Sequence, residues 1–327
     1  MTQSVNESTL LGVSVSPHIK SGKTTQKIML DVIIALLPVC IAAVVLFGAR
    51  VLLLLAVASV SCVLSELLFN LIVKKPCTIS DLSAVVTGVI LALNVPVTLP
   101  LWQLAFGSVV AMCMVKGLFG GIGQNFANPA ITARILLFVT FPATMGEISH
   151  SLFCGSHPGL SPELVSSATP LAIMAKGETP PSLIDMLLGN HTTSAVGETC
   201  GIAIILGFLY LLFRRVITAH TPVCFVGTVF LLSLISTGNL TDALYLILSG
   251  GLLFGAVFMA TDYATTPTSK LGRAVFGVGC GLITFVIRRF GAYPEGVSMA
   301  ILFMNLLTPY IEQICRRRPL GAGGKRK

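Results

Sequence analysis

Charged residues are scarce in this chain. Asp, Glu, Lys and Arg make up 10% of its 327 residues, and hydrophobic residues make up 54%. Soluble domains carry about 25% charged residues. The mean hydropathy is +0.90. This number of charged residues is too small to cover the surface of a water-soluble globular protein. The composition therefore predicts an all-α integral membrane protein.

The chain also lacks the motifs of soluble catalysis. It has no phosphate-binding P-loop, no Gly-x-Gly-x-x-Gly opening a βα unit and no HExxH helix. Its nine cysteines form no CxxC pair and no Cys/His cluster. Most of them lie in apolar stretches, where a thiol behaves as a small hydrophobic group. We therefore expect no metal or iron–sulfur site and no complete catalytic centre in this chain alone.

Long apolar runs fill most of the sequence. A membrane-spanning helix needs roughly 20 mostly apolar residues. Ten such stretches can be drawn, several of them short or interrupted by Gly and Pro: 28–47, 51–73, 82–101, 104–118, 129–141, 198–213, 221–236, 243–260, 274–286 and 297–314. Residues 1–27 are polar and lack the short apolar core of a cleavable signal peptide. The sequence predicts about ten transmembrane helices.

The distribution of basic residues predicts the topology. With ten spans and residues 1–27 inside, 17 of the 21 Lys and Arg residues fall in cytoplasmic segments, Lys116 and Arg134 among them. The exceptions are Arg50, Lys176, Arg288 and Arg289. This bias follows the positive-inside rule. Both termini, with the basic tail 316–327, are predicted to be cytoplasmic, and the polar loop 143–197 lies on the outer face. Topology explains the net charge of +8, so no nucleic acid partner is needed.

An internal repeat is visible at an offset of about 170 residues. Phe106-Gly107, Phe119-Gly120 and Ala130-Ile131 correspond to Phe276-Gly277, Phe290-Gly291 and Ala300-Ile301. An odd number of spans separates the copies, so they insert in opposite orientations. We predict two inverted five-helix repeats, 28–142 and 198–315, with a site near the membrane midplane between them. The breaks at Asn94-Val95-Pro96 and at 261–267 either line that site or are ordinary loops.

Five acidic residues lie in or at the ends of the apolar stretches. An ionisable group inside a membrane is costly, which makes each a candidate for an ion path. The alternative is interfacial placement, with pairing to Lys27 or Lys74. The five are Asp31, Glu66, Asp81, Glu198 and Asp262.

The outer loop contains Ser166-Ser167-Ala168-Thr169-Pro170. A threonine hydroxyl can form a phosphoester, and small neighbours leave it accessible to a modifying enzyme. Pro170 disfavours a helical conformation at Thr169. On spacing alone, such a segment is also typical of a surface turn.

At this point the chain resembles the RnfD/NqrB family, and within it RnfD, over nearly its whole length. The resemblance is carried by Ser16-Pro17-His18-Ile19, Asn125-Phe126-Ala127-Asn128-Pro129-Ala130, the segment 259–267 and Tyr293-Pro294-Glu295-Gly296-Val297. In that family FMN is joined through its phosphate to a threonine in roughly Asp-x-x-Ser-(Gly/Ser)-Ala-Thr. Ser166, Ser167, Ala168 and Thr169 match the last four positions, and Glu163 stands where the family has Asp. The resemblance makes Thr169 the acceptor, with Ser166 and Ser167 as competitors.

The resemblance implies a flavin-carrying membrane subunit of a bacterial ion-translocating oxidoreductase complex, which couples electron transfer between ferredoxin and NAD to Na⁺ or H⁺ movement. The expected partners are the other subunits, membrane lipid and a flavin transferase, and the expected location is the bacterial cytoplasmic membrane. As in relatives, a second, non-covalent flavin such as riboflavin is expected among the helices. Asn94, Asp262, Thr265 and Thr266 are the candidate contacts for that flavin or for an ion path.

Two alternatives stay open. Arg288 and Arg289 are placed to meet a flavin phosphate, anionic lipid or a partner subunit. An inverted repeat with broken helices is also how channels and secondary transporters without a redox cofactor are built.

Overall fold

The computed structural model describes residues 24–74, 78–121, 123–149, 170–175, 180–191, 193–291 and 296–315. These residues form helices and connecting segments. Their only β pairing is the isolated bridge between Ser149 and Thr193. The prediction of an all-α architecture is confirmed for this part of the chain.

The described residues of the first half form five main helical segments. It contains α1 (Thr25–Phe47), α2 (Arg50–Val73), the 3₁₀ turn η2 (Ile79–Asp81), α3 (Ser83–Leu93), α4 (Leu101–Val110) with its π-helical continuation η3 (Ala111–Gly117), α5 (Pro129–Thr140) and the short α6 (Pro142–Met145). Two short helices follow, α8 (Pro170–Ala175) and α9 (Leu183–Leu188).

The second half contains five more such segments. It contains η4 (Val196–Glu198), α10 (Gly201–Phe213), α11 (His220–Thr237), α12 (Leu240–Leu248), α13 (Leu252–Phe254) with the π-helix η5 (Gly255–Met259), α14 (Lys270–Phe290) and α15 (Val297–Cys315). Each of the ten apolar stretches of the sequence therefore contains a helix.

Not every helix is long enough to cross a membrane. Among the described residues, α1, α2, α11, α14 and α15 meet the length and hydropathy of a span, and the bent pair of α12 with α13–η5 makes a sixth. Four further apolar helical segments, α3, α4–η3, α5 and α10, have 10–17 residues. The molecule is a multi-pass membrane protein with five or six helices of spanning length and shorter ones among them.

Side chains at the helix ends explain where several helices begin. Thr24 accepts a hydrogen bond from the Lys27 amide at the start of α1. Asn128 accepts from Ala130 and Ile131 at the start of α5, and Pro129 fills the first helical position. These caps satisfy amides that have no partner within the helix. The start of the apolar stretch predicted at Pro129 is therefore confirmed, and the cap at Asn128 explains it.

Two of the predicted apolar stretches are interrupted by breaks in the helix. α3 ends at Leu93, as the Asn94-Val95-Pro96 break predicts, because Pro96 cannot continue a helix. The apolar stretch predicted over 243–260 is interrupted as well. The chain turns by 65° between α12 and α13, where Gly250 and Gly251 have φ of +65° and +66°. Only glycine adopts that left-handed conformation readily.

The outer surface of the helices is apolar. Leu71 is 71% exposed, Phe213 87% and Ile314 84%. Such exposure of large aliphatic and aromatic side chains is unusual for a soluble monomer, and it fits lipid contact. Buried side chains, among them Leu36, Leu91 and Phe276, fill the interior between the helices.

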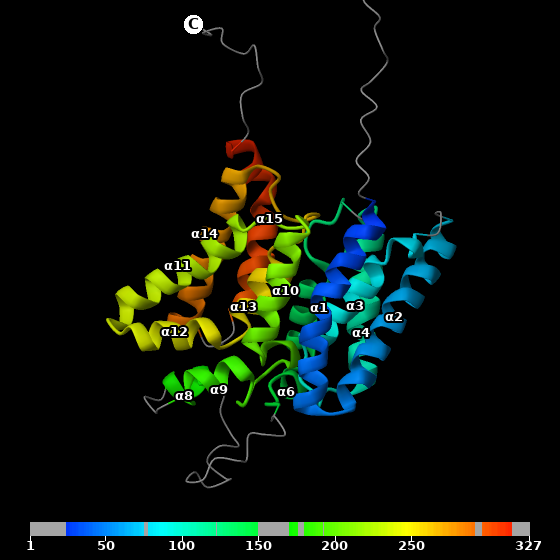
Figure 1. The fold of residues 1–327 in the computed structure, drawn as a ribbon. Coiled ribbons are helices and arrows are strands. Elements are labelled where there is room, and N and C mark those ends of the chain that lie inside the picture. The colour runs from blue at the N-terminus through cyan, green and yellow to red at the C-terminus, as the bar shows by residue number, and fades with distance from the viewer. Residues whose placement is uncertain are drawn as a thin grey trace, which may run out of the picture.

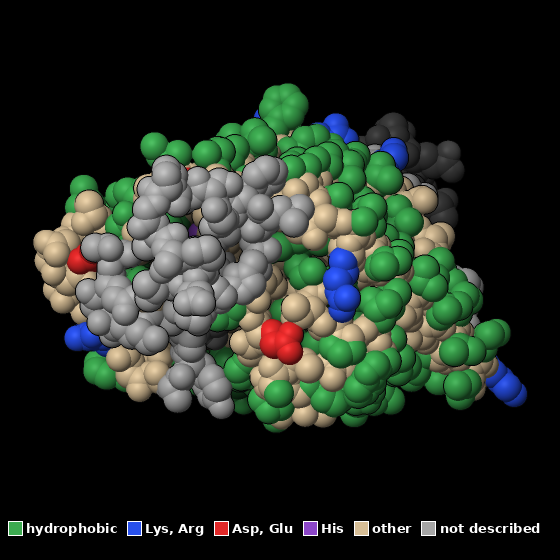
Figure 2. Space-filling model, turned by 90° about the horizontal axis from the view of Figure 1, so that it is seen from below, with side chains coloured by type: hydrophobic (Ala, Val, Ile, Leu, Met, Phe, Trp, Pro, Cys, Tyr) green, Lys and Arg blue, Asp and Glu red, His purple; other side chains and the backbone are tan. Residues whose placement is uncertain are grey.

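α1 begins and α15 ends at the same end of the molecule, the upper end of Figure 1, which we call the termini end. The opposite end, which we call the loop end, carries α6, α8 and α9. Seen from the loop end, hydrophobic side chains line the rim and few charged side chains of described residues are visible (Figure 2).

Candidate functional site

A buried polar cluster joins the two halves of the chain. The Arg134 guanidinium on α5 donates to the Glu198 carboxylate on η4 at 3.2 Å, to the Asn94 amide oxygen at 3.2 Å and to the Ser298 hydroxyl on α15 at 3.0 Å. The side chains of Arg134 and Glu198 are 12% and 3% exposed. We call these four residues the central cluster. A charge in an apolar interior is stable only when it is paired and hydrogen-bonded.

The interrupted helices make room for this cluster. Because α3 stops at Leu93, the Asn94 side chain turns back to donate to the Ile90 carbonyl at 2.8 Å, and its oxygen faces Arg134. A Cβ atom at Gly251 would collide with the Glu198 carboxylate. The same glycine that permits the left-handed turn therefore leaves space for the acidic group.

A second buried ion pair links α2 to η3. The Lys116 ammonium lies 2.5 Å from the Glu66 carboxylate, with both side chains 6% exposed. Lys116 also donates to the Ser83 hydroxyl at 2.7 Å, and the Thr78 hydroxyl donates to Glu66 at 2.6 Å. The second Glu66 oxygen is buried without a hydrogen-bond partner. A cavity of about 210 Å³ adjoins the pair.

A third acidic group is held between α1 and α10. Asp31 accepts hydrogen bonds from the Tyr210 hydroxyl at 3.2 Å and from Arg214 at 3.1 Å. Glu66 and Asp31 therefore pair with Lys116 and Arg214, residues 50 and 183 positions away. Both of these partners differ from Lys27 and Lys74, the two considered from the sequence.

Two of the basic residues counted as cytoplasmic lie inside helical segments, Arg134 in α5 and Lys116 in η3. Both are committed to buried carboxylates. The positive-inside rule reads charge from position along the chain, so it cannot recognise a basic residue whose acidic partner is distant in sequence.

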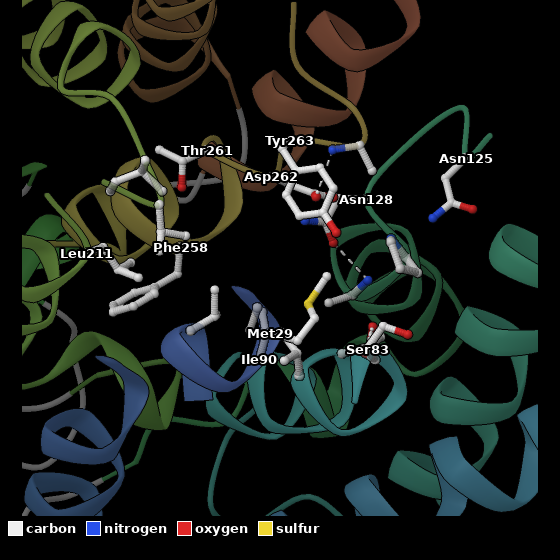
Figure 3. A pocket seen from close by; sticks show the side chains of 18 of the residues that line it. Met29, Ser83, Ile90, Asn125, Asn128, Leu211, Phe258, Thr261, Asp262 and Tyr263 are labelled. Carbon is white, nitrogen blue, oxygen red and sulfur yellow. Dashed lines mark hydrogen bonds between the residues drawn. The ribbon is translucent and has the colours of Figure 1, made fainter. Parts of the chain in front are cut away.

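A cavity of about 90 Å³ lies between the halves (Figure 3). Leu211 and Phe258 stand on its apolar side, and Asn125, Asn128 and Asp262 gather on its polar side with Tyr263. Apolar walls with a few convergent polar groups are typical of ligand sites, which usually measure about 300–1,000 Å³. As it stands, the cavity admits water or a small ion rather than a three-ring flavin.

The four residues predicted for a second flavin or an ion path do not share one surface. Asp262 lines the cavity, and its carboxylate accepts from the Ala264 amide and the Thr265 hydroxyl. Thr266 is buried and donates to the Asp262 carbonyl at 2.8 Å. Asn94 belongs to the central cluster, and its amide lies 3.5 Å from the Met259 sulfur. Asp262 therefore shapes its own loop as well as facing the cavity.

The segment Ser166, Ser167, Ala168 and Thr169 lies outside the described residues, but the chain that follows it is placed. Leu171, in α8 at the loop end, is 7% exposed and touches Gly250 so closely that a Cβ there would collide with it. The Arg288 guanidinium lies beside Gly250. It donates to the carbonyls of Leu246 at 2.6 Å and of Ser249 and Gly250 at 3.0 Å.

Arg288 thus binds the backbone where α12 ends, which gives it a partner other than the three weighed from the sequence. Leu171, two residues after Thr169, and the Arg288 guanidinium both lie beside Gly250. The turn that Arg288 binds could have been predicted from the sequence, because Ser249-Gly250-Gly251 interrupts an apolar run.

His191 is buried at the loop end. It is 2% exposed, and burial lowers its pKa from 6.5 to about 4, against the opposing influence of the Asp185 backbone and carboxylate. The imidazole is therefore neutral at pH 7. Across the described part of the chain no three His, Cys, Asp or Glu residues come together as metal ligands.

The chain is similar to proteins of one family. A family model described as NQR2, RnfD, RnfE matches residues 12–321. The chain is 41% identical, over 95% of both sequences, to the D subunit of the Na⁺-translocating ferredoxin:NAD⁺ oxidoreductase complex of Acetobacterium woodii. It is 34% identical, over 100% of both, to the D subunit of the proton-translocating ferredoxin:NAD⁺ oxidoreductase complex of Clostridium ljungdahlii. It is 34% identical, over 94% of both, to the D subunit of the ion-translocating oxidoreductase complex of Ectopseudomonas mendocina.

Proposed function

Because this chain belongs to the NQR2, RnfD, RnfE family, we propose that it is the flavin-carrying membrane subunit of an ion-translocating ferredoxin:NAD⁺ oxidoreductase complex. The observation that carries the proposal is the match to the D subunits of such complexes over 94–100% of both chains. The other subunits of that complex are its proposed partners. We propose that this chain does not itself bind NAD but passes electrons between neighbouring subunits.

We propose FMN joined to Thr169 through a phosphoester. The sequence Ser166-Ser167-Ala168-Thr169 supports this assignment. The position of Leu171, which packs against Gly250 near the Arg288 guanidinium, supports it as well, because it places a cation close to the chain that follows Thr169. A flavin supplies reversible electron transfer when it is bound. The chain just after the attachment segment, at Leu171, packs against Gly250, and a flavin transferase is proposed to complete the phosphoester bond.

The proposed topology has ten spans in two inverted repeats, with both termini in the cytoplasm. Supporting contacts correspond between the halves: α2 packs on α3 and α4, and α11 packs on α12 and α14. α1 packs on α10, and α5 on α15. The third segment of each half is interrupted, at Asn94 and at Gly250. In this topology the loop end faces the outside of the bacterial cytoplasmic membrane. The cavity of Figure 3, which Met29 near the start of α1 helps to line, then lies on the cytoplasmic side.

A second, non-covalent flavin such as riboflavin is proposed at that cavity. The amides of Asn125 and Asn128 fit the polar edge of a flavin ring, and Leu211 and Phe258 fit its apolar edge. Because the free volume is about 90 Å³, binding requires the wall to open. Tyr263, 43% exposed, is the side chain at which we expect that movement.

In-gel fluorescence tests the flavin assignment. The protein, produced in a host that has the flavin transferase, is denatured and examined under ultraviolet light after electrophoresis. We expect a fluorescent band from the wild type and from Ser166→Ala and Ser167→Ala, and none from Thr169→Val. A dark wild-type band would favour a channel or secondary transporter instead. Fluorescence that persists in Thr169→Val would assign the acceptor to Ser166 or Ser167.

A further inference from the structure

A polar bridge joins the two halves of the chain beside the cavity of Figure 3. Asp31 on α1 accepts hydrogen bonds from the Tyr210 hydroxyl at 3.2 Å and from the Arg214 guanidinium at 3.1 Å. Tyr210 lies in the last turn of α10, and Arg214 is the residue that follows this helix. We call these three residues the α1–α10 bridge. Because α1 belongs to the first half and α10 to the second, the bridge ties the halves together.

The neighbours of the bridge line the cavity. Met29, two positions before Asp31, lines it from α1. Leu211, next to Tyr210, lines it from α10 (Figure 3). The two helices therefore form adjoining parts of the cavity wall, and the bridge holds these parts together.

The same two helices touch closely about one turn earlier in α10. A Cβ atom at Gly207 would collide with the Ala35 carbonyl oxygen of α1 and with the Phe258 ring. Such close approach of two helices requires a small residue at the contact. Because nothing can move inward at Gly207, we expect α1 and α10 to pivot there and to separate at the bridge.

The bridge is more easily released than the other two ion pairs described above. The Arg214 side chain is 52% exposed, whereas the four side chains of the other two pairs are 3–12% exposed. Water screens an exposed ion pair, so such a pair stabilises one conformation only slightly. The α1–α10 bridge is therefore the ionic contact between the halves at which opening costs least.

We propose that the α1–α10 bridge is a latch that keeps the cavity closed, and that its release admits a planar ring ligand of flavin size. The closed cavity measures about 90 Å³, whereas ligand sites usually measure about 300–1,000 Å³. A three-ring ligand fits only when the walls are apart, so the bridge is broken in the occupied form. For the identity of the ligand, this inference rests on the second flavin proposed above.

A latch of this kind makes ligand binding tighter when it is removed. The bridge stabilises the closed form alone, so its loss raises the fraction of molecules that are open, and the apparent affinity rises by the same factor. A half-exposed ion pair changes such an equilibrium by about two- to fivefold. A contact that merely supported the site would have the opposite effect, because its loss would distort the cavity and weaken binding.

The first measurement reports opening without any ligand. Thr87, on the α3 wall of the cavity, is 8% exposed, and Thr87→Cys places a thiol of similar size there. The rate at which N-ethylmaleimide labels this thiol is followed by peptide mass spectrometry on the full chain in mixed micelles. Adding Arg214→Gln should accelerate labelling about two- to fivefold, and Tyr210→Phe should act in the same direction. Lys270→Gln is the matched control, because it removes an exposed basic side chain at the start of α14, and it should leave the rate unchanged.

The second measurement is the binding of radiolabelled riboflavin to protein washed free of non-covalent flavin. Arg214→Gln should bind riboflavin about two- to fivefold more tightly than the wild type, through faster entry. Lys270→Gln should bind it as the wild type does. Tyr263→Ala tests the other part of the wall. A gain in affinity in Tyr263→Ala with none in Arg214→Gln would place the opening at Tyr263 alone and would overturn the latch.

The two measurements separate this inference from the proposed function. If the wild type and all variants bind no riboflavin, the proposed second flavin is wrong, while faster labelling in Arg214→Gln still supports a latch for another planar ligand. If the wild type binds riboflavin and Arg214→Gln changes neither labelling nor affinity, the latch is wrong and the second flavin stands. Weaker binding in Arg214→Gln would also overturn the latch, because it would show that the bridge supports the occupied form.

Discussion

The Lys116–Glu66 pair offers a quantitative test of the buried electrostatics. Lys116→Met removes the ammonium group 2.5 Å from a carboxylate that is 6% exposed. The Glu66 side chain then escapes its unpaired buried charge by taking up a proton. For an ordinary glutamate, neutralisation costs about 3.7 kcal/mol at pH 7 and about 1 kcal/mol at pH 5. These values set the expected loss in the free energy of unfolding at each pH.

Equilibrium denaturation in mixed micelles, at pH 7 and pH 5, measures this loss. Lys116→Met should be destabilised by about 3–4 kcal/mol relative to the wild type at pH 7 and by about 1 kcal/mol at pH 5. The double variant Glu66→Gln/Lys116→Met has no buried charge at this position, so its stability relative to the wild type should not recover at pH 5 in this way. A Lys116→Met penalty equal at the two pH values, or below about 1 kcal/mol at pH 7, would refute the reasoning.

Two further variants follow from the loop end and the central turn. Gly251→Ala combines a left-handed φ of +66° with a collision against Glu198, so it should lose at least about 1–2 kcal/mol of stability. Gly227→Ala in α11 is the control, because a Cβ there meets nothing within 4 Å, and its stability should be unchanged or rise by about 0.5–1 kcal/mol. Equal melting temperatures for the two variants would show that the left-handed turn at Gly251 does not require glycine. Burial lowers the pKa of His191 from 6.5 to about 4, so the unfolded state binds the proton more tightly and stability is lost as pH falls between these values. The protection of residues 180–191 against hydrogen exchange, corrected for intrinsic rates, should therefore fall by about 2 kcal/mol from pH 7 to pH 5. The His191→Asn variant should lose this pH dependence. If protection falls equally in the wild type and in His191→Asn, His191 is not its source.

The helices and several of their ends could be predicted from the sequence, and the structure shows the physical causes of these ends. The break at Asn94-Val95-Pro96 follows from a proline that cannot continue α3, and the start of α5 follows from the cap at Asn128. Helix ends of this kind depend on residues that are neighbours in the chain, so they can be predicted from a single sequence.

The central cluster could not be found in the same way. Arg134 bonds Asn94, 40 residues earlier, Glu198, 64 residues later, and Ser298, 164 residues later. No local pattern marks partners at these separations, and the rule that counts basic residues placed Arg134 in a cytoplasmic segment. Glu198 was identified as costly in a membrane, but its partner appeared only when the helices were assembled.

The glycine anchors of the repeat also show the limit of sequence matching. A Cβ at Gly107 would meet Leu137 on α5, whereas one at Gly277 would meet the backbone of α11. The proposed repeat makes these two glycines equivalent, but they face different neighbours. The proposal of a repeat is therefore supported better by which helices pack together than by the matched residues.

The attachment of FMN at Thr169 is the central claim, and peptide mass spectrometry of residues 155–176 tests it most directly. The account predicts a peptide heavier by FMN less one water, with fragment ions that place the added mass on Thr169, and the unmodified mass in Thr169→Val. A wild-type peptide of unmodified mass, from a host that contains the flavin transferase, would contradict the account.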